Sequence, residues 1–223
     1  MSVSTSYATL AELRAHPSLK LAAGETADDT LLSALLLAVT AMIDKHTGRT
    51  FQASADTTRY FDARRDVLSP DPSYRNAYGA GYGGFALTML TNDDLAQITS
   101  IANGDGDTLE TTEYVTEPRN ILDVDNGNYA PIWAIRFKWS SGKFWTFNTD
   151  FENAITVVGR WAYSVTPPTA VKRACIEGSA ALYRMSLSGD SDRPIIAGGG
   201  TVIEPSRMPA IFWALLAPYV RKV

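Results

Sequence analysis

The sequence has few of the side chains that bind metals or form cross-links. Its 223 residues include one cysteine, Cys175, and two histidines, His16 and His46. A single cysteine excludes a disulfide within the chain, and these three side chains cannot supply the usual ligand sets of a zinc site. We therefore expect a protein of a reducing compartment that has no cofactor and no metal ion.

A surplus of positive charge is also lacking. The sequence has 20 lysine and arginine residues against 24 aspartate and glutamate residues, which gives a net charge of −4 and an isoelectric point near 5.2. Proteins that grip DNA by neutralising its phosphates need a clear excess of basic residues. The composition argues against tight DNA binding, but it leaves open a mildly acidic surface along which DNA passes without adhering.

No hydrophobic run is long enough to cross a bilayer. The most apolar stretch, residues 31–43, is shorter than the roughly 20 residues of a transmembrane helix, and Asp44 and Lys45 end it. The N-terminal residues show no basic region followed by an apolar core, so we expect no secretory signal. Because 45% of the residues are hydrophobic, an ordinary share for a globular protein, we expect a soluble protein with no membrane partner.

Sequence signatures of catalysis are missing as well. No G-x-S-x-G elbow accompanies either histidine. Residues 79–84 match the letters G-x-G-x-x-G, but a strand-like pattern follows them where a dinucleotide site needs a helix. Residues 103–107 begin like a calcium loop, yet Thr108 and Tyr114 replace its glycine and glutamate, so a hairpin turn is favoured. We expect no enzyme, and only a paired-carboxylate hydrolase stays open.

Helical patterns occupy both ends of the chain. Residues 9–12 have capping-box spacing and predict a short helix. A long helix follows, capped by Asp28 or Asp29 and ended by Gly48. Its predicted apolar stripe consists of Leu32, Leu35, Leu36, Val39, Met42 and Ile43.

Two more helices are predicted after residue 165. Thr166 and two prolines favour a helix start, and that helix runs to about Leu187. The centre of its apolar stripe is small, which permits close approach by a neighbouring helix, and the stripe of residues 32–43 is the natural candidate. A last short helix covers residues 209–219. The small-centred stripe consists of Val171, Ala174, Cys175, Gly178, Ala181, Leu182 and Met185.

Short strand patterns fill the middle of the chain. The predicted strands are residues 57–62, 85–90, 97–102, 113–116, 135–139, 144–147, 154–158 and 161–165. Eight aromatic residues of this region are interpreted as its core, and a sugar-stacking platform is the alternative. They are Trp133, Phe137, Trp139, Phe144, Trp145, Phe147, Phe151 and Trp161.

These patterns predict an α+β protein. Residues 1–52 and 166–223 are expected to form a helical bundle, with residues 53–165 inserted as a β-rich domain. A long loop at residues 69–84 interrupts the insertion, and its Tyr74, Tyr78 and Tyr82 are predicted to contact a partner that orders it. Plain disorder at a loop tip is the alternative for this segment.

The C-terminal segment 209–223 is strongly apolar and ends on a basic tip. A loose end of this kind would expose a large aromatic surface, so it must dock on its own helices, on another protein, or on both. The residues predicted to contact another protein or a neighbouring subunit are Ile211, Phe212, Trp213, Leu215, Leu216, Tyr219 and Arg221.

Four segments resemble the head-to-tail connector, or adaptor, proteins of tailed bacteriophages. They are residues 7–13, residues 38–51, residues 157–168 with the helix after them, and residues 215–219, and together they bracket nearly the whole chain. Each motif alone is weakly specific, so the resemblance rests on their order and separation. The long loop and the aromatic-rich insertion exceed the pattern of short family members.

The resemblance implies a structural subunit of the virion neck. Such proteins form a ring, usually of twelve copies, that binds beneath the portal, contacts the next neck or tail protein, and leaves a channel through which DNA is ejected without specific binding. The implied location is the virion, assembled in the host cytoplasm. Segment 201–223 is the expected portal contact.

Two other functions are kept as alternatives. A carbohydrate-binding or host-adhesion module predicts that Trp133, Trp139 or Trp145 lies exposed in a row. A carboxylate hydrolase predicts at least two acidic side chains that converge in one cleft.

Overall fold

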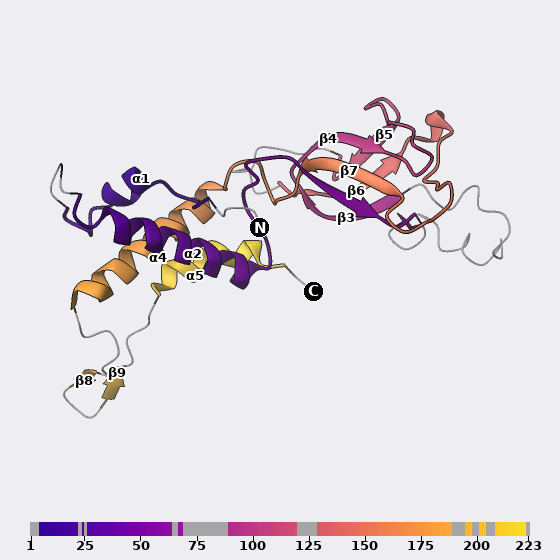
Figure 1. Cartoon of the computed structure of the whole chain (residues 1–223). Helices are drawn as coiled ribbons and strands as arrows, with labels where there is room; N and C mark the ends of the chain where they lie inside the picture. The colour runs from indigo at the N-terminus through magenta and orange to yellow at the C-terminus, as the bar shows by residue number, and fades with distance from the viewer. Residues whose placement is uncertain are drawn as a thin grey trace. The chain divides into compact units, whose positions relative to one another are not determined.

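The computed structural model describes residues 5–21, 24, 26–63, 67–68, 89–119, 129–188, 195–197, 201–203 and 208–221. The chain divides into two compact units, which we call the helical unit (Met1–Phe51 with Pro167–Val223) and the β unit (Gln52–Thr166) (Figure 1). Helices α1, α2, α4 and α5 belong to the first unit, and two antiparallel sheets belong to the second. The predicted α+β class is confirmed.

Local signals at the chain's N-terminal end set the first two helices. α1 (Leu10–Arg14) begins with a capping box, in which the Thr9 hydroxyl accepts from the Glu12 N–H at 3.2 Å and the Glu12 carboxylate accepts from the Thr9 N–H at 2.8 Å. α2 (Asp29–Thr47) ends at Gly48, whose φ of 66° is left-handed. Asp28 stands at the N-cap position of α2 without capping it, because its carboxylate accepts a hydrogen bond from the Tyr183 hydroxyl.

Three helices meet at a glycine. α4 (Thr169–Ser188) packs against α2 and against α5 (Ala210–Leu216), which a 3-10 helix, η2 (Ala217–Tyr219), continues. A Cβ atom at Gly178 of α4 would lie 3.0 Å from Val39 Cγ1 and 3.0 Å from Phe212 Cε2. The glycine therefore allows α2 and α5 to approach α4 closely, as the small-centred stripe predicts. A short hairpin, β8 (Ile195–Ala197) and β9 (Thr201–Ile203), lies between α4 and α5 in the sequence.

The buried face of α2 differs from the predicted stripe. Met42 is 39% exposed, whereas Thr40 and Thr47 are buried. Both threonines have partners for their hydroxyl groups: Thr40 Oγ1 accepts from the Tyr7 N–H at 3.2 Å, and Thr47 Oγ1 donates to the carbonyl of Ile43 at 2.8 Å. Satisfied hydroxyls can be buried at little cost, so hydrophobicity alone misplaces the stripe.

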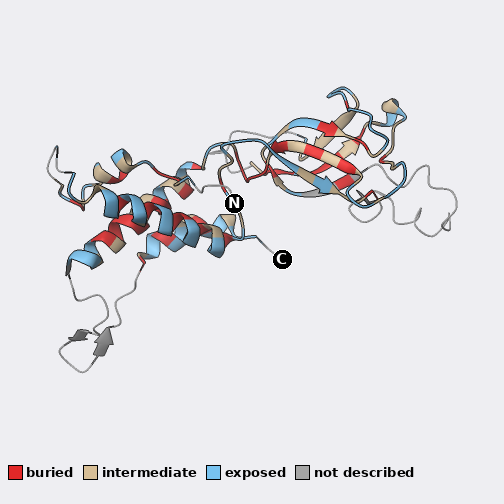
Figure 2. Ribbon diagram, viewed as in Figure 1, coloured by how far each residue is buried: buried red, intermediate tan, exposed pale blue. Residues whose placement is uncertain are grey.

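The β unit contains two antiparallel sheets. The first has the order β1 (Thr57–Phe61), β7 (Ile155–Arg160), β4 (Gln97–Ala102). The second has the order β2 (Val67–Leu68), β3 (Met89–Leu95), β6 (Ile132–Phe137), β5 (Tyr114–Glu117). Both sheets contribute to one buried cluster, so the unit is a small sandwich (Figure 2). The cluster contains Ala63, Leu90, Leu95, Ile101, Leu109, Ile132, Ile135, Phe137, Trp145, Ile155, Val157 and Trp161.

Two predicted strands are wrong, and a third, predicted at residues 135–139, lies at residues 132–137 instead. Residues 144–147 form only one isolated bridge, and residues 161–165 are irregular. Trp161 in the second segment packs into the core and donates from Nε1 to the Thr57 carbonyl at 3.0 Å, which explains its apolar pattern without a strand. β6 stops at Phe137, and Trp139 begins a 3-10 turn, η1 (Trp139–Ser141).

Candidate functional site

Neither histidine nor the cysteine is part of a catalytic or metal-binding group among the residues described. Cys175 is fully buried on α4, 3.7 Å from Thr40 Oγ1, and burial raises the pKa of its thiol, so it packs as an unreactive side chain. His16 Nε2 lies 3.5 Å from the Glu177 carboxylate, and the His46 ring lies 4.7 Å from the Trp213 ring. In the described part of the chain, no three His, Cys, Asp or Glu side chains are placed to hold a metal ion.

The calcium-like segment is a turn stabilised by a lysine. The Asn103 N–H donates to the Asp107 carbonyl at 2.8 Å, which closes the turn after β4, as predicted. The Lys143 ammonium lies 2.6 Å from the Asp107 carboxylate and 2.7 Å from the Glu113 carboxylate. A positive side chain of the protein itself therefore already neutralises the acidic side of this turn.

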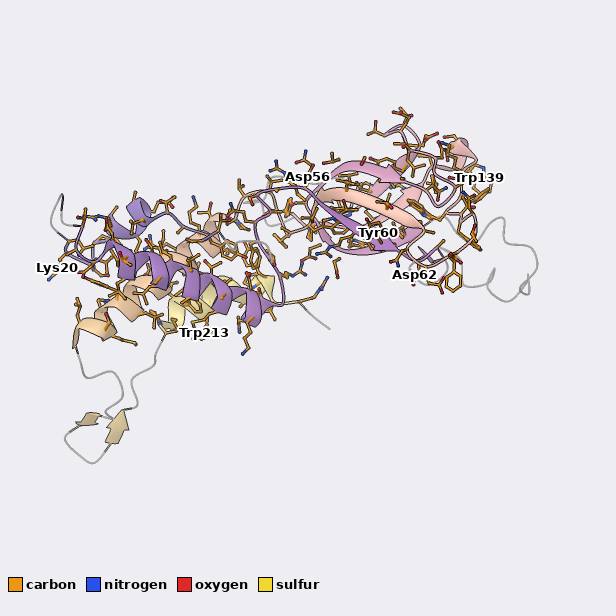
Figure 3. All side chains as sticks on the ribbon, viewed as in Figure 1. Lys20, Asp56, Tyr60, Asp62, Trp139 and Trp213 are labelled. Atoms are coloured by element: carbon orange, nitrogen blue, oxygen red, sulfur yellow. The ribbon has the colours of Figure 1, made fainter. Side chains whose placement is uncertain are left out.

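The β-unit aromatics divide between core and surface. Phe137, Trp145 and Trp161 are buried, which confirms the core interpretation for them. Trp133 is 48% exposed and Trp139 is 85% exposed, and Trp139 projects from the turn of η1 (Figure 3). The core prediction is wrong for these two. Trp133 lies on β6 between the buried Ile132 and Ala134 and so faces the opposite side of the sheet, whereas Trp139 lies beyond the end of β6, in the turn of η1.

The C-terminal segment docks back on the helical unit. Phe51, at the exit from α2, is fully buried between Tyr7 and Tyr219, with ring centroids 5.8 Å and 5.5 Å away in edge-on contacts. The Arg221 N–H donates to the Thr47 carbonyl at 2.9 Å. The end of the described chain is thus fixed to the last turn of α2.

Docking separates the predicted contact residues into two groups. Phe212 and Leu216 are fully buried against the protein's own helices, so their surfaces are not available to another molecule in this conformation. Leu215 and Tyr219 are half-buried, and Ile211, Trp213 and Arg221 are exposed. The loop residues Tyr74, Tyr78 and Tyr82 lie outside the described residues.

A pocket opens between α4 and α5. It has a volume of about 580 Å³, and apart from Arg184 its lining is uncharged. Arg184 donates from Nε to the Ala180 carbonyl of its own helix at 3.3 Å. The lining residues are Ala181, Arg184, Met185, Met208, Pro209, Ala210 and Trp213.

The outer face of α2 is uncharged, and sequence reasoning missed it. Leu31, Leu37 and Met42 are 40%, 46% and 39% exposed, and the alanines at 34, 38 and 41 are exposed between them (Figure 2). A surface helix normally carries charged residues on this side. The signal was in the sequence, because no charged residue occurs between Asp29 and Asp44. Even so, no helix in the described residues is long and apolar enough to cross a membrane.

No protein-family model matches the chain, and no curated protein does. Solved structures do match nearly all of it, among them the following two. A chain in the neck of an empty GTA particle, computed with C6 symmetry, is 15% identical, with 97% of this chain and 92% of that chain covered and a TM-score of 0.53. A chain in the virion of the native gene transfer agent (GTA) particle is also 15% identical, with coverage of 99% and 95% and a TM-score of 0.50.

Both matches extend across the helical unit and the β unit, so the two-unit organisation is shared as a whole. The GTA particle is a phage-like head-tail structure. At 15% identity the comparison shows a shared fold, and this shared fold supports the resemblance to the head-to-tail connector proteins.

Proposed function

We propose that the protein is a structural subunit of a phage neck. In this proposal it forms an oligomeric ring of twelve copies that binds the portal, links the DNA-filled head to the tail, and leaves a channel for DNA. The observation that carries the proposal is the match to a neck component over 97% of the chain. The protein would act without catalysis, as a component of virions assembled in the host cytoplasm.

The charge of the chain supports a passage for DNA. A net charge of −4 gives DNA little to adhere to, so phosphates can pass a channel lined by such subunits. We also propose a role for each part of the chain. The two helical segments form the connector domain, and the inserted β unit faces the next neck or tail protein.

The exposed part of the C-terminal segment is the proposed contact with the portal or a neighbouring subunit. Ile211 is 49% exposed on α5, and Arg221 is exposed just after η2. The contact rests on these residues with the half-buried Leu215 and Tyr219, because Phe212 and Leu216 fill the core. Tyr74, Tyr78 and Tyr82 stay a proposed loop contact.

Electron microscopy of the purified chain mixed with the portal protein of the same particle tests the proposal. We expect a ring of subunits on one end of the portal. Ile211→Glu should abolish attachment, whereas the matched control Trp139→Ala should not. Deleting residues 209–223 should abolish attachment too, but it also removes the buried Phe212 and Leu216, so the point variant decides. Normal attachment by Ile211→Glu would remove the C-terminal assignment, and a portal without any ring would remove the function.

Exposed tryptophans favour a second candidate, a carbohydrate-binding or host-adhesion module. Trp133 and Trp139 are both exposed, as a stacking surface for sugars requires, although Trp145 is buried. Tryptophan fluorescence titrated with host-surface glycans tests this candidate. A saturable change that Trp139→Phe removes would support it, and no change would exclude it for those glycans.

A further inference from the structure

The helical unit carries two apolar surfaces of opposite shape. One is the outer face of α2, on which Leu31, Leu37 and Met42 protrude. The other is the pocket between α4 and α5, to which α2 contributes no lining residue. The two surfaces therefore belong to different elements, although Trp213 of the pocket also contacts His46 in the last turn of α2, with ring centroids 4.7 Å apart.

The outer face of α2 limits the chemistry of what covers it. Over residues 30–43 it offers no charge with which a charged partner could pair, so an acidic or basic surface placed there would lose its hydration without compensation. α4 differs, because its exposed positions include Arg173 and Arg184. A partner for α2 must itself be nearly uncharged and must have room for protruding aliphatic side chains.

The pocket meets both conditions. Alanine, methionine, proline and tryptophan side chains form its walls, and its one charged residue, Arg184, is classed as exposed, so its guanidinium can stay in water while its stem packs. The pocket, with a volume of about 580 Å³, is open to solvent rather than enclosed, so aliphatic side chains that protrude from a helix can reach into it.

We infer that the occupant is a second copy of this chain: the outer face of α2 in one subunit packs into the α4–α5 pocket of the next. The inference rests on the ring proposed above and names its contact. Identical subunits around a closed ring meet through two unlike patches, one on each side of the subunit. A protruding face and a matching pocket on the same chain supply such a pair.

Engineered cysteines test the contact in the full-length protein. The native Cys175 is fully buried, so we expect it to form no disulfide with another subunit. One chain carries both Leu37→Cys, at an exposed position of α2, and Ala210→Cys, at the pocket. This double variant is mixed with portal protein and treated with oxidised glutathione. Because the contact is head-to-tail, we expect a ladder of disulfide-linked dimers, trimers and larger species. Each single variant alone should stay monomeric, and an equal mixture of the two should stop at dimers.

A matched control places the second cysteine elsewhere. Leu37→Cys with Ser100→Cys, an exposed position on β4, should give no ladder. Leu37→Glu should weaken self-association on the portal by about tenfold or more, because a carboxylate would be buried against apolar walls. Tyr60→Glu, at a 60% exposed residue of β1, should leave self-association unchanged.

The outcomes separate this contact from the ring itself. Rings seen by electron microscopy without a ladder would overturn the contact and leave the ring in place. Dimers from Leu37→Cys alone would show that α2 meets α2, which also overturns it. If portal carries neither rings nor cross-linked species, the proposed function fails and the contact fails with it. A ladder in the absence of portal binding would support the contact and reject the neck role.

Discussion

The helical unit and the β unit solve the problem of a small core in different ways. In the helical unit, three helices close on a glycine, and the residues that pack around it, Val39 and Phe212, are far apart in sequence. In the β unit, two sheets enclose large aromatic residues such as Phe137, Trp145 and Trp161. The first core depends on close backbone approach, and the second depends on side-chain volume.

The surfaces of the two units also differ, in the distribution of charged side chains. The β unit carries ion pairs on its surface, among them Arg59 with Asp93 at 2.9 Å and Lys143 with Asp107 at 2.6 Å. The helical unit has ion pairs as well, such as Lys172 with Glu12 at 3.0 Å, but it leaves the outer face of α2 and part of α5 uncharged. The difference suggests that the β unit is complete by itself, whereas the helical unit keeps apolar surface for assembly. Each unit should therefore respond to substitutions in its own core alone.

The largest expected effect concerns Trp145 of the β unit. Its side chain is 1% exposed, and its ring lies 4.6 Å from Phe137. Trp145→Ala leaves a cavity and should lower the free energy of unfolding of the β unit by about 3–5 kcal/mol. Urea denaturation followed by tryptophan fluorescence reports mainly on this unit, because four of the five tryptophans, at 133, 139, 145 and 161, belong to it.

The control for this prediction is Trp139→Ala. Trp139 is 85% exposed, so its removal should change stability by no more than about 0.5 kcal/mol. If Trp145→Ala shifts the far-ultraviolet circular dichroism transition of the helices as much as the fluorescence transition, the two units do not unfold separately and the comparison is wrong.

A somewhat smaller effect is expected at Gly178 in the helical unit. Leucine there would push into Val39 and Phe212, which already lie 3.0 Å from the position of a Cβ atom. Overpacking should cost about 3 kcal/mol, more than the roughly 1 kcal/mol that helix propensity returns. The transition followed by circular dichroism should move and the fluorescence transition should stay. Ala41→Leu, on the exposed face of α2, is the control, and an equal loss in both variants would contradict close packing at Gly178.

The sequence predicts these helices well because their signals are local. The capping box at Thr9 and the left-handed Gly48 each act within a few residues. It misses the burial of Thr40, which depends on a distant partner, the Tyr7 N–H. It misses the exposure of Trp139, which depends on where β6 stops. Alternation of polar and apolar residues does not contain that information.

The candidate site is less predictable than the fold. An apolar pattern marked the C-terminal helix as a contact element, but it could not tell that Phe212 and Leu216 face inward while Ile211 and Trp213 face outward. The pocket could not be predicted from the sequence, because α4, which ends at Ser188, and α5, which begins at Ala210, build it together. The uncharged outer face of α2 could have been found, since the absence of charge is visible in the sequence.

A moderate effect is expected at Tyr7, which fixes the N-terminal segment to α2. Its hydroxyl donates to the Asp44 carboxylate and accepts from the Phe51 N–H at 2.8 Å. Tyr7→Phe leaves both groups without this partner and should destabilise the helical unit by about 1–2 kcal/mol in urea denaturation. Tyr60→Phe is the control, because Tyr60 is 60% exposed on the β unit. Equal, small effects in both variants would show that the buried hydroxyl contributes little.

The same contact makes the helical unit sensitive to pH. Burial raises the pKa of Asp44 from 3.8 to about 6, against the opposing effect of the hydrogen bond from Tyr7. The folded protein then holds a proton more tightly than the unfolded chain, so this group destabilises the fold above pH 6 and its penalty disappears as the pH falls from 6 towards 4. The urea midpoint of wild type minus that of Asp44→Asn should therefore fall as the pH rises from 4 to 6. A difference that is flat or rises with pH would show that Asp44 is not buried as described.

The smallest effect is expected at Lys143, where the β-unit surface can be compared with the α2 face directly. The lysine donates hydrogen bonds to Asp107 and Glu113, and the one to Glu113 lowers the pKa of that carboxyl group. Lys143→Met should raise the pKa of Glu113 towards its ordinary value, which carboxyl NMR titration measures. Because the folded pKa is depressed, the stabilisation exists at neutral pH and is lost as the pH falls through the titration of Glu113. Salt should weaken this stabilisation too, since these groups face water.

Lys45→Met on α2 is the matched control and should leave the titration of Glu113 unchanged. A loss of stability in Lys143→Met that survives both acid and salt would mean that the turn depends on packing of the lysine stem. The contrast between the charged surface of the β unit and the uncharged outer face of α2 would then lose its electrostatic basis.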